Sequence, residues 1–178
     1  MLPSPSDNPA SDLVRRAVHE YESMLTGYAY NLTNDLEMAR DVTQDTFIKL
    51  YGQENGKLEG AGLKAWLFTV CRNRSIDLMR RRRRQVSIED SPVDHFPDPT
   101  PSPDSSAAFH DETAMVLETF RRLPAKQAEV LRLKFQNDLS YQEIADITGL
   151  SASNVGFLIH TGLKRLRSLL APEGAGCV

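Results

Sequence analysis

Aromatic residues and arginines share one segment in the middle of the chain. It begins around Trp66 and ends in five consecutive arginines, Arg80 to Arg84. Between residues 72 and 84 the sequence holds seven arginines and one acidic residue, although the whole chain carries a formal net charge of -3. Arginine binds phosphate through a planar fork of N–H donors, and aromatic rings stack on bases. The segment is therefore predicted to bind nucleic acid, as one helix over about residues 63–83.

Within this helix, Asn73 and Asp77 fall on the same face as Trp66 and Arg80, where they can bond base edges or fix the arginines. The pattern leaves two points open. Trp66 can stack on bases or pack in the core, and the arginines can be a solvated basic end rather than a phosphate clamp. The candidate contact residues of the segment are Trp66, Arg72, Asn73, Asp77, Arg80, Arg81 and Arg84.

A second recognition pattern lies near the C-terminus. Ser140 and Glu143 have the spacing of a capping box, in which each side chain bonds the other residue's backbone amide at a helix start. Gly149 suits the left-handed end of that short helix, and Ser151 suits the N-cap of the longer helix that follows. This arrangement predicts a helix-turn-helix, although an antiparallel helix pair that merely packs would share part of the pattern.

In such a motif the N-terminal part of the second helix enters the major groove. Gly156 and Phe157 stand there in place of the expected Lys or Arg, so Phe157 can touch a thymine methyl or be covered by a partner protein. The apolar stripe predicted to pack inward is Val155, Leu158, Ile159, Leu163, Leu166 and Leu170. The candidate base readers are Ser153, Asn154 and Phe157; His160, Lys164 and Arg165 complete the candidate DNA surface, with Lys164 and Arg165 nearer to phosphate.

A third candidate surface lies on the helix predicted over residues 36–51. Its inward face is predicted to be Ala39, Val42, Thr43, Thr46, Phe47 and Leu50. The outward face would then expose an isoleucine among acidic and polar side chains. Such a patch is typical of a protein interface with a basic partner, and a solvated face with one stray apolar residue is the alternative. The residues of this patch are Asp41, Gln44, Asp45 and Ile48.

Helical periodicity throughout, with no strand alternation, predicts an all-α protein of two small helical domains. A linker rich in Pro, Asp and Ser separates them, with seven acidic residues and no Lys or Arg between residues 85 and 113. The C-terminal domain carries the helix-turn-helix. The predicted order is a disordered N-terminus (1–10), a helical domain (11–84), the flexible linker (85–112), a second helical domain (113–171) and a tail (172–178).

Composition limits the chemistry. No apolar run is long enough to span a bilayer, and residues 1–6 do not read as a secretory signal, so a cytoplasmic location without membrane insertion is expected. The two cysteines, Cys71 and Cys177, are far apart, and Cys71 is predicted to be a small core residue. The histidines have no metal-ligand spacing and no nucleophile has a companion base. We therefore expect no metal, no cofactor and no enzymatic activity.

Taken together, these motifs resemble those of bacterial extracytoplasmic-function sigma factors, the small RNA polymerase specificity subunits that keep conserved regions two and four. Residues 41–47 (DVTQDTF) resemble the part of region two that docks on the polymerase β′ clamp helices. Residues 65–80 resemble the part of region two that melts and reads the −10 element. Residues 123–127 (LPAKQ) and 139–145 (LSYQEIA) resemble region four, which reads the −35 element.

The resemblance implies that polymerase core, through its β′ clamp helices and β flap, and promoter DNA are partners, and that an anti-sigma factor is a further one. It implies binding to the nucleoid when the chain is bound to polymerase. Family members carry more basic residues near positions 156–160 than this chain does. The alternatives are a helix-turn-helix regulator that acts without polymerase core, and an all-helical adaptor with incidental basic patches.

Overall fold

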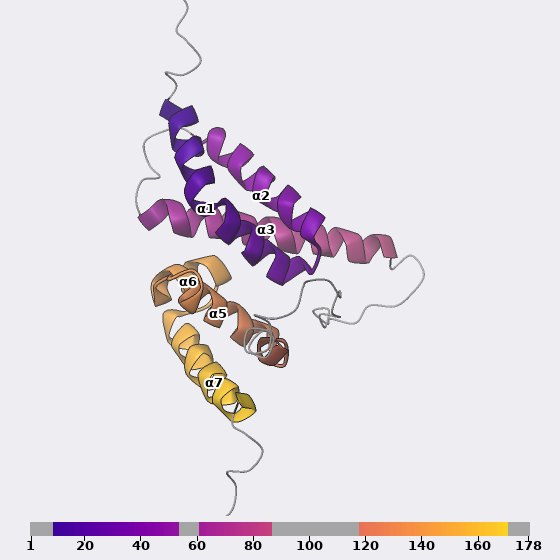
Figure 1. Cartoon of the computed structure of the whole chain (residues 1–178), viewed down its shortest axis with the longest axis vertical. Helices are drawn as coiled ribbons and strands as arrows, with labels where there is room; N and C mark the ends of the chain where they lie inside the picture. Colours follow the sequence, from indigo (N-terminus) through magenta and orange to yellow (C-terminus); the bar gives the residue numbers. More distant parts are fainter. Residues whose placement is uncertain (1–8, 54–60, 87–117, 171–178) are drawn as a thin grey trace, which may run out of the picture. The chain divides into compact units, whose positions relative to one another are not determined.

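The computed structural model describes residues 9–53, 61–86 and 118–170, and these form helices and turns with no strand among them. The chain divides into two compact units, made chiefly of residues 1–93 and 94–178. The prediction of an all-α protein with two helical domains is confirmed. The helices, labelled in Figure 1, are α1 (Pro9–Thr33), α2 (Leu36–Tyr51), α3 (Ala61–Val86), α5 (Ala125–Phe135), α6 (Tyr141–Thr148) and α7 (Ala152–Leu170).

In the N-terminal unit, α1 and α2 lie side by side as a hairpin and α3 crosses both (Figure 1). Their apolar faces meet in one core, where the rings of Tyr28 and Phe68 lie 5.3 Å apart between centroids. Cys71 is buried there as predicted, and burial raises the pKa of its thiol to about 12. All six residues predicted for the inward face of α2 are buried: Ala39, Val42, Thr43, Thr46, Phe47 and Leu50.

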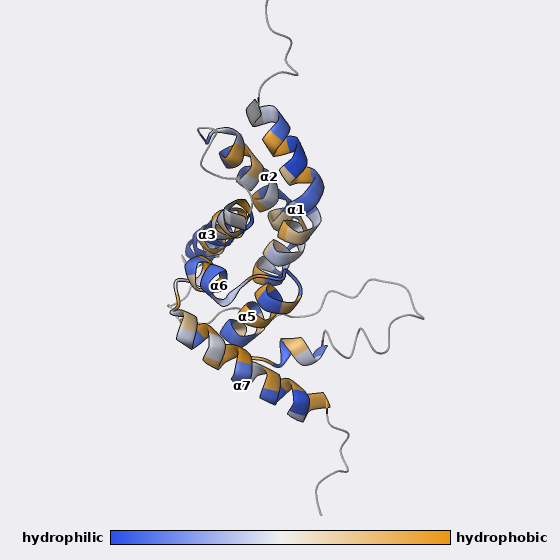
Figure 2. Cartoon of the chain, turned by 90° about the vertical axis from the view of Figure 1, so that its left-hand side faces the viewer, coloured by the Kyte–Doolittle hydropathy of each residue, from blue (hydrophilic) through white to orange (hydrophobic). Residues whose placement is uncertain are grey.

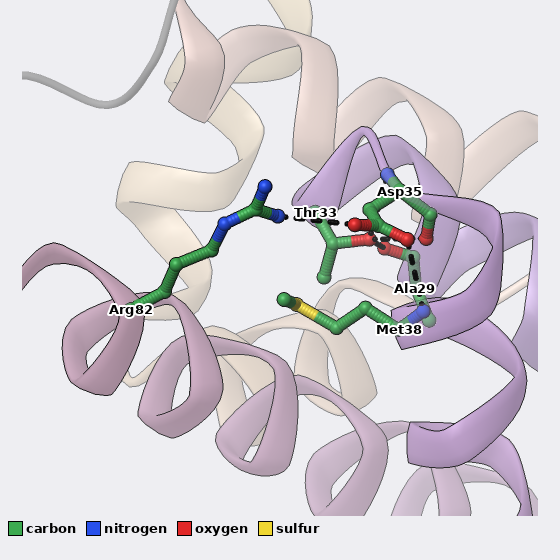
Figure 3. A network of polar contacts seen from close by, with 5 residues as sticks. All are labelled: Ala29, Thr33, Asp35, Met38 and Arg82. Carbon is green, nitrogen blue, oxygen red and sulfur yellow. Dashed lines mark hydrogen bonds and ion pairs between the residues drawn. The ribbon is translucent and has the colours of Figure 1, made fainter. Parts of the chain in front are cut away.

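A tight turn between α1 and α2 fixes the hairpin, and α3 is fastened to it (Figure 3). Asn34 adopts a left-handed conformation (φ 53°). Asp35 is the N-cap of α2, and its carboxylate accepts from the Met38 amide at 3.1 Å and from the Arg82 guanidinium at 3.0 Å. The amide first, and then the guanidinium, hold the pKa of Asp35 below its ordinary value. One carboxylate therefore caps α2 and anchors the arginine-rich end of α3.

The C-terminal unit packs α5 against α7, with α6 between them in sequence. Both bonds of the predicted capping box are present: Ser140 accepts from the Glu143 amide and Glu143 accepts from the Ser140 amide. Gly149 ends α6 in the left-handed conformation (φ 73°), and Ser151 accepts from the Asn154 amide at the start of α7. The predicted helix-turn-helix is thus confirmed, with its turn chemistry.

Hydrophobic and hydrophilic residues alternate around these helices, as expected where each helix buries one face (Figure 2). On α7 the buried positions are Val155, Ile159 and Gly162. A Cβ at Gly162 would lie 2.9 Å from Leu131 Cδ1, so glycine permits the close approach of α7 to α5. The predicted apolar stripe is wrong at its end, because Leu170, the last residue of α7, is exposed.

Three helix boundaries differ from prediction. The predicted disordered N-terminus, 1–10, is wrong at its last two residues, because α1 begins at Pro9; proline is tolerated in a first helical turn. The helix predicted over 63–83 spans Ala61–Val86, so the predicted linker start at residue 85 is also wrong. Arginine is a good helix former and nothing in the arginine run stops the helix.

The other predicted segments lie wholly or partly outside the described residues. These are residues 1–8, residues 54–60 of a loop predicted over 52–62, the linker from 87 onward, the first part (113–117) of a helix predicted over Thr113–Leu123, and the tail with Cys177. In the described part of the C-terminal unit, residues 118–121 form a helical turn ahead of Pro124. None of the helices described is both long and apolar enough to cross a bilayer.

Candidate nucleic-acid and polymerase interfaces

The first candidate surface is the outward face of α3. Leu67, Phe68 and Cys71 occupy the core with no exposed area. Trp66, next to them in sequence, is only half-buried. The other candidates extend from it toward the arginine run. Arg72 is half-buried, and the exposed members are Asn73, Asp77, Arg80, Arg81 and Arg84.

The arginine run is not uniform. Arg82 turns back to the α1–α2 turn and pairs with Asp35 (Figure 3). Within the described residues, no hydrogen bond or ion pair holds Arg80, Arg81 or Arg84. The helix therefore uses one arginine of the run to fix its own end and presents the other four, Arg80, Arg81, Arg83 and Arg84, to solvent, where they can meet phosphate. The anchoring role of Arg82 was missed, since the sequence does not show which arginine faces the hairpin turn.

The second candidate surface is the outward face of α2. Asp41 and Gln44 are exposed, and Ile48 is 68% exposed, as the helical period predicted. Asp45 differs, because its carboxylate is half-buried and accepts from Arg74 of α3 at 2.7 Å. An acidic residue of the α2 surface is thus already neutralised by the neighbouring helix.

Sequence reasoning missed one residue of this surface. Tyr51 is 56% exposed and lies three residues after Ile48, on the same face of α2. The two side chains make a pair of exposed apolar groups on the face of α2 that also carries Asp41 and Gln44. The signal was present in the helical period, which places Tyr51 in line with Asp41, Gln44 and Ile48.

The third candidate surface is the outward face of α7. Val155 and Ile159 turn into the core of the C-terminal unit, Gly156 and Leu158 are half-buried, and Phe157 between them faces solvent. Phe157 is 64% exposed. All six predicted DNA-contacting residues are exposed on this helix: Ser153, Asn154, Phe157, His160, Lys164 and Arg165.

Each of the three candidate surfaces carries side chains suited to binding a partner molecule. In the described parts of the chain, no three His, Cys, Asp or Glu side chains gather where a metal ion could bind. Capped helix ends, exposed guanidiniums and exposed aromatic rings bind phosphates and bases without covalent chemistry.

Two family models match the chain in order. The model described as Sigma-70 region 2 matches residues 17–85, and the model described as Sigma-70, region 4 matches residues 113–166. The first match contains the candidate surfaces of α2 and α3, and the second contains that of α7. Together the two matches cover more than half of the chain.

Among curated relatives, the chain is 29% identical to the ECF RNA polymerase sigma factor SigM of Bacillus subtilis, over 80% of this chain and 85% of that one. It is 28% identical to the ECF RNA polymerase sigma factor EcfG of Rhodopseudomonas palustris, over 94% of this chain and 90% of that one. It is also 28% identical to the ECF RNA polymerase sigma factor SigE of Mycolicibacterium smegmatis, over 89% of this chain, but it spans only 62% of that longer relative.

Solved structures of other proteins share this fold. The sigma factor RpoE in its co-crystal structure with the anti-sigma factor NepR from Bartonella quintana has a TM-score of 0.71 and 26% identity, over 92% of this chain and 99% of that one. CnrH, in complex with the cytosolic domain of CnrY, shares the fold with a TM-score of 0.61. Both matched regions, their order and these relatives lead to one conclusion: the chain belongs to the sigma-70 family of RNA polymerase sigma factors, in the extracytoplasmic-function class.

Proposed function

We propose that the chain binds RNA polymerase core and directs it to promoters through three surfaces with separate roles. The observation that carries the proposal is their order. An acidic and apolar face on α2 is followed by an aromatic-to-arginine face on α3, both within the matched region 2, and then by a capped helix-turn-helix within the matched region 4. The polymerase forms phosphodiester bonds, and this chain supplies sequence preference.

The face of α2 is the proposed docking site for the polymerase β′ clamp helices. Ile48 and Tyr51 supply exposed apolar area that a partner can bury, and Asp41 with Gln44 supplies polar selectivity. Asp45 attracts a basic partner less strongly than Asp41 does, because its carboxylate is already paired with Arg74. Its proposed role includes joining α2 to α3, so that the docked helix and the DNA-reading helix move as one piece.

The face of α3 is the proposed site for reading and melting the −10 element. Unstacking a base costs a few kcal/mol, and stacking on an aromatic ring returns about 1–3 kcal/mol per base. Trp66 is the proposed ring, because it is only partly buried while Leu67 and Phe68 fill the core. Asn73 and Asp77 follow on the same face, and Arg72, Arg80, Arg81 and Arg84 are proposed to hold phosphates on either side.

The face of α7 is the proposed reader of the −35 element. Ser153, Asn154 and Phe157 lie at the N-terminal end that enters the major groove, and His160, Lys164 and Arg165 lie further along the helix. Other parts of the C-terminal unit are proposed to meet the polymerase β flap. The linker predicted at 85–112 is proposed to connect the two units, and residues 87–112 of it lie outside the described residues.

The proposal also includes a protein that controls the chain and a location in the cell. RpoE of Bartonella quintana was crystallised with an anti-sigma factor, and we propose that a protein of that kind also controls this chain. We propose a cytoplasmic location, with the chain on the nucleoid when it is bound to polymerase.

The docking surface is tested with a double variant, Asp41→Ala with Ile48→Ala. Both side chains are exposed, and the Asp45–Arg74 pair stays intact, so the fold should be unchanged. We expect at least a tenfold loss of binding to purified core polymerase. The matched control is Glu22→Ala with Tyr30→Ala, which removes an exposed acid and an exposed large apolar group from α1 and should bind normally.

Normal polymerase binding by a folded Asp41/Ile48 variant would show that the docking surface is wrongly placed. A second measurement, DNA binding with and without core polymerase, distinguishes the proposed function from the alternative. A regulator that acts without polymerase should bind its duplex site tightly alone, whereas we expect tight and selective binding only when core polymerase is present.

A further inference from the structure

The N-terminal half of α7 carries no formal charge. Residues 152–163 contain no Lys, Arg, Asp or Glu, and the basic residues Lys164, Arg165 and Arg167 follow only afterwards. The commonest specific contact in the major groove is a bidentate bond from Arg or Lys to guanine. That contact is not available where this helix enters the groove, so base selectivity must come from other side chains.

The structure places one large side chain at that point. Phe157 is 64% exposed and shares a stripe with Ser153, His160 and Lys164, at spacings of four, three and four residues. Val155 and Ile159 are buried on the other side. The stripe begins near the capped start of α7 and ends at a basic residue, as expected of a helix that meets bases first and phosphates later.

A second aromatic ring stands next to this stripe. A Cβ at Gly156 would lie 3.4 Å from the ring of Tyr141. Tyr141 of α6 therefore rests against α7 at Gly156, the residue that precedes Phe157. Lys134 Nζ lies 5.8 Å from the centroid of the same ring. Tyr141 is therefore held between two elements, and it occupies part of the space that a long basic side chain at position 156 would use.

We propose that Phe157 is the specificity-determining residue of the −35 reader and selects a thymine through its 5-methyl group. Thymine is the base that presents a methyl in the major groove, and apolar side chains contact it there. The inference rests on the proposed function of α7. DNA is favoured over a protein as the occupant, because the stripe holding Phe157 is otherwise polar and leads into Lys164 and Arg165.

The test uses holoenzyme formed from the full chain and core polymerase, and a promoter duplex that this holoenzyme selects from a randomised pool. Each thymine of the upstream element is replaced in turn by deoxyuridine, which pairs identically and lacks only the methyl. At one position we expect about fourfold weaker binding, the effect of one apolar carbon losing its contact. With Phe157→Ala, the thymine and deoxyuridine probes should bind equally at that position.

Phe135→Ala is the matched control, since it removes another exposed phenylalanine of the same unit and should keep the fourfold discrimination. Equal binding of thymine and deoxyuridine probes by the wild-type holoenzyme overturns the inference. So does discrimination that persists in Phe157→Ala, and so does a loss of holoenzyme assembly in that variant, which would make Phe157 a protein contact. If the holoenzyme selects no sequence at all, the proposed function fails, and this inference fails with it.

Discussion

Two helices of this chain are assigned to DNA, and their surfaces differ in kind. The end of α3 presents Arg80, Arg81 and Arg84 to solvent, with Arg82 folded back onto Asp35. The first three turns of α7 present Ser153, Asn154, Phe157 and His160 without a formal charge. A surface rich in guanidinium groups binds phosphate at any sequence, whereas a polar and aromatic surface gains little unless the bases match.

Under the proposed function, this difference predicts that one unit supplies mainly affinity for DNA and the other mainly selectivity for its sequence. Salt should weaken the contribution of α3 steeply and that of α7 only slightly, because counterion release accompanies phosphate contacts. Base substitution should do the reverse. Binding by either unit is then weak alone, and polymerase is needed to hold both on one promoter.

The largest expected effect comes from removing exposed arginines. In Arg80→Ala with Arg84→Ala, two phosphate contacts are lost, and the slope of log K against log salt should become about 1.8 less negative, at about 0.9 per phosphate. Promoter affinity should fall about 30-fold at 0.15 M salt, which corresponds to about 1 kcal/mol for each contact. Filter binding or anisotropy of the holoenzyme on promoter DNA over a salt series measures both quantities.

The charge-matched control is Arg15→Ala with Arg16→Ala, two exposed arginines on α1. It should leave the slope unchanged. If the control changes the slope as much as the α3 variant does, the arginines act through net charge and the contrast between α3 and α7 loses its basis.

A second variant tests whether the two units are stable independently. In Gly162→Val, the new side chain meets Leu131 in the core, and overpacking should destabilise the C-terminal unit by about 1–3 kcal/mol. Gly27→Val, on an exposed face of α1 with open space around it, should change stability by less than about 0.5 kcal/mol. Hydrogen exchange should show faster opening in α5 and α7 of the first variant, with α1–α3 unchanged; equal acceleration in α1–α3 would contradict independence.

A smaller effect is expected at the anchor of the arginine run. Asp35→Ala removes the N-cap of α2 and the partner of Arg82, and it should cost about 1 kcal/mol of unfolding free energy at neutral pH. Because the folded-state pKa of Asp35 is lowered, its ionised form stabilises the fold above the unfolded pKa of about 3.9, and this stability is lost as pH falls through the folded pKa.

Asp35→Asn separates the two roles, since asparagine also caps helices but carries no charge. Urea unfolding between about pH 2 and 7 should show a smaller loss than in Asp35→Ala at neutral pH, and a flatter acid limb than in the wild type. An acid limb as steep as that of the wild type would show that other groups, and not Asp35, govern the response to acid.

Local patterns allowed most of the fold to be predicted. The capping box, the left-handed glycine and the inward face of α2 depend on residues three or four positions apart, so they can be read along the chain. The contacts between helices could not be predicted. The Asp45–Arg74 pair, the Asp35–Arg82 pair and the approach of Gly162 to Leu131 join residues 29 or more positions apart and depend on packing.

The candidate sites divide in the same way. Exposure of Ile48 and Phe157 followed from helical period, whereas the position of Trp66 at the edge of the core did not, because Leu67 and Phe68 competed for the same space. Tyr51 was within reach of the pattern and was overlooked. Which of these side chains contact polymerase or DNA stays a prediction.

The most direct test is transcription by core polymerase with and without the full chain, on genomic DNA, with every transcript start mapped. We predict a limited set of new starts that share two conserved elements upstream. The Asp41→Ala with Ile48→Ala variant should produce none of them. Starts that are the same with and without the chain would contradict the account.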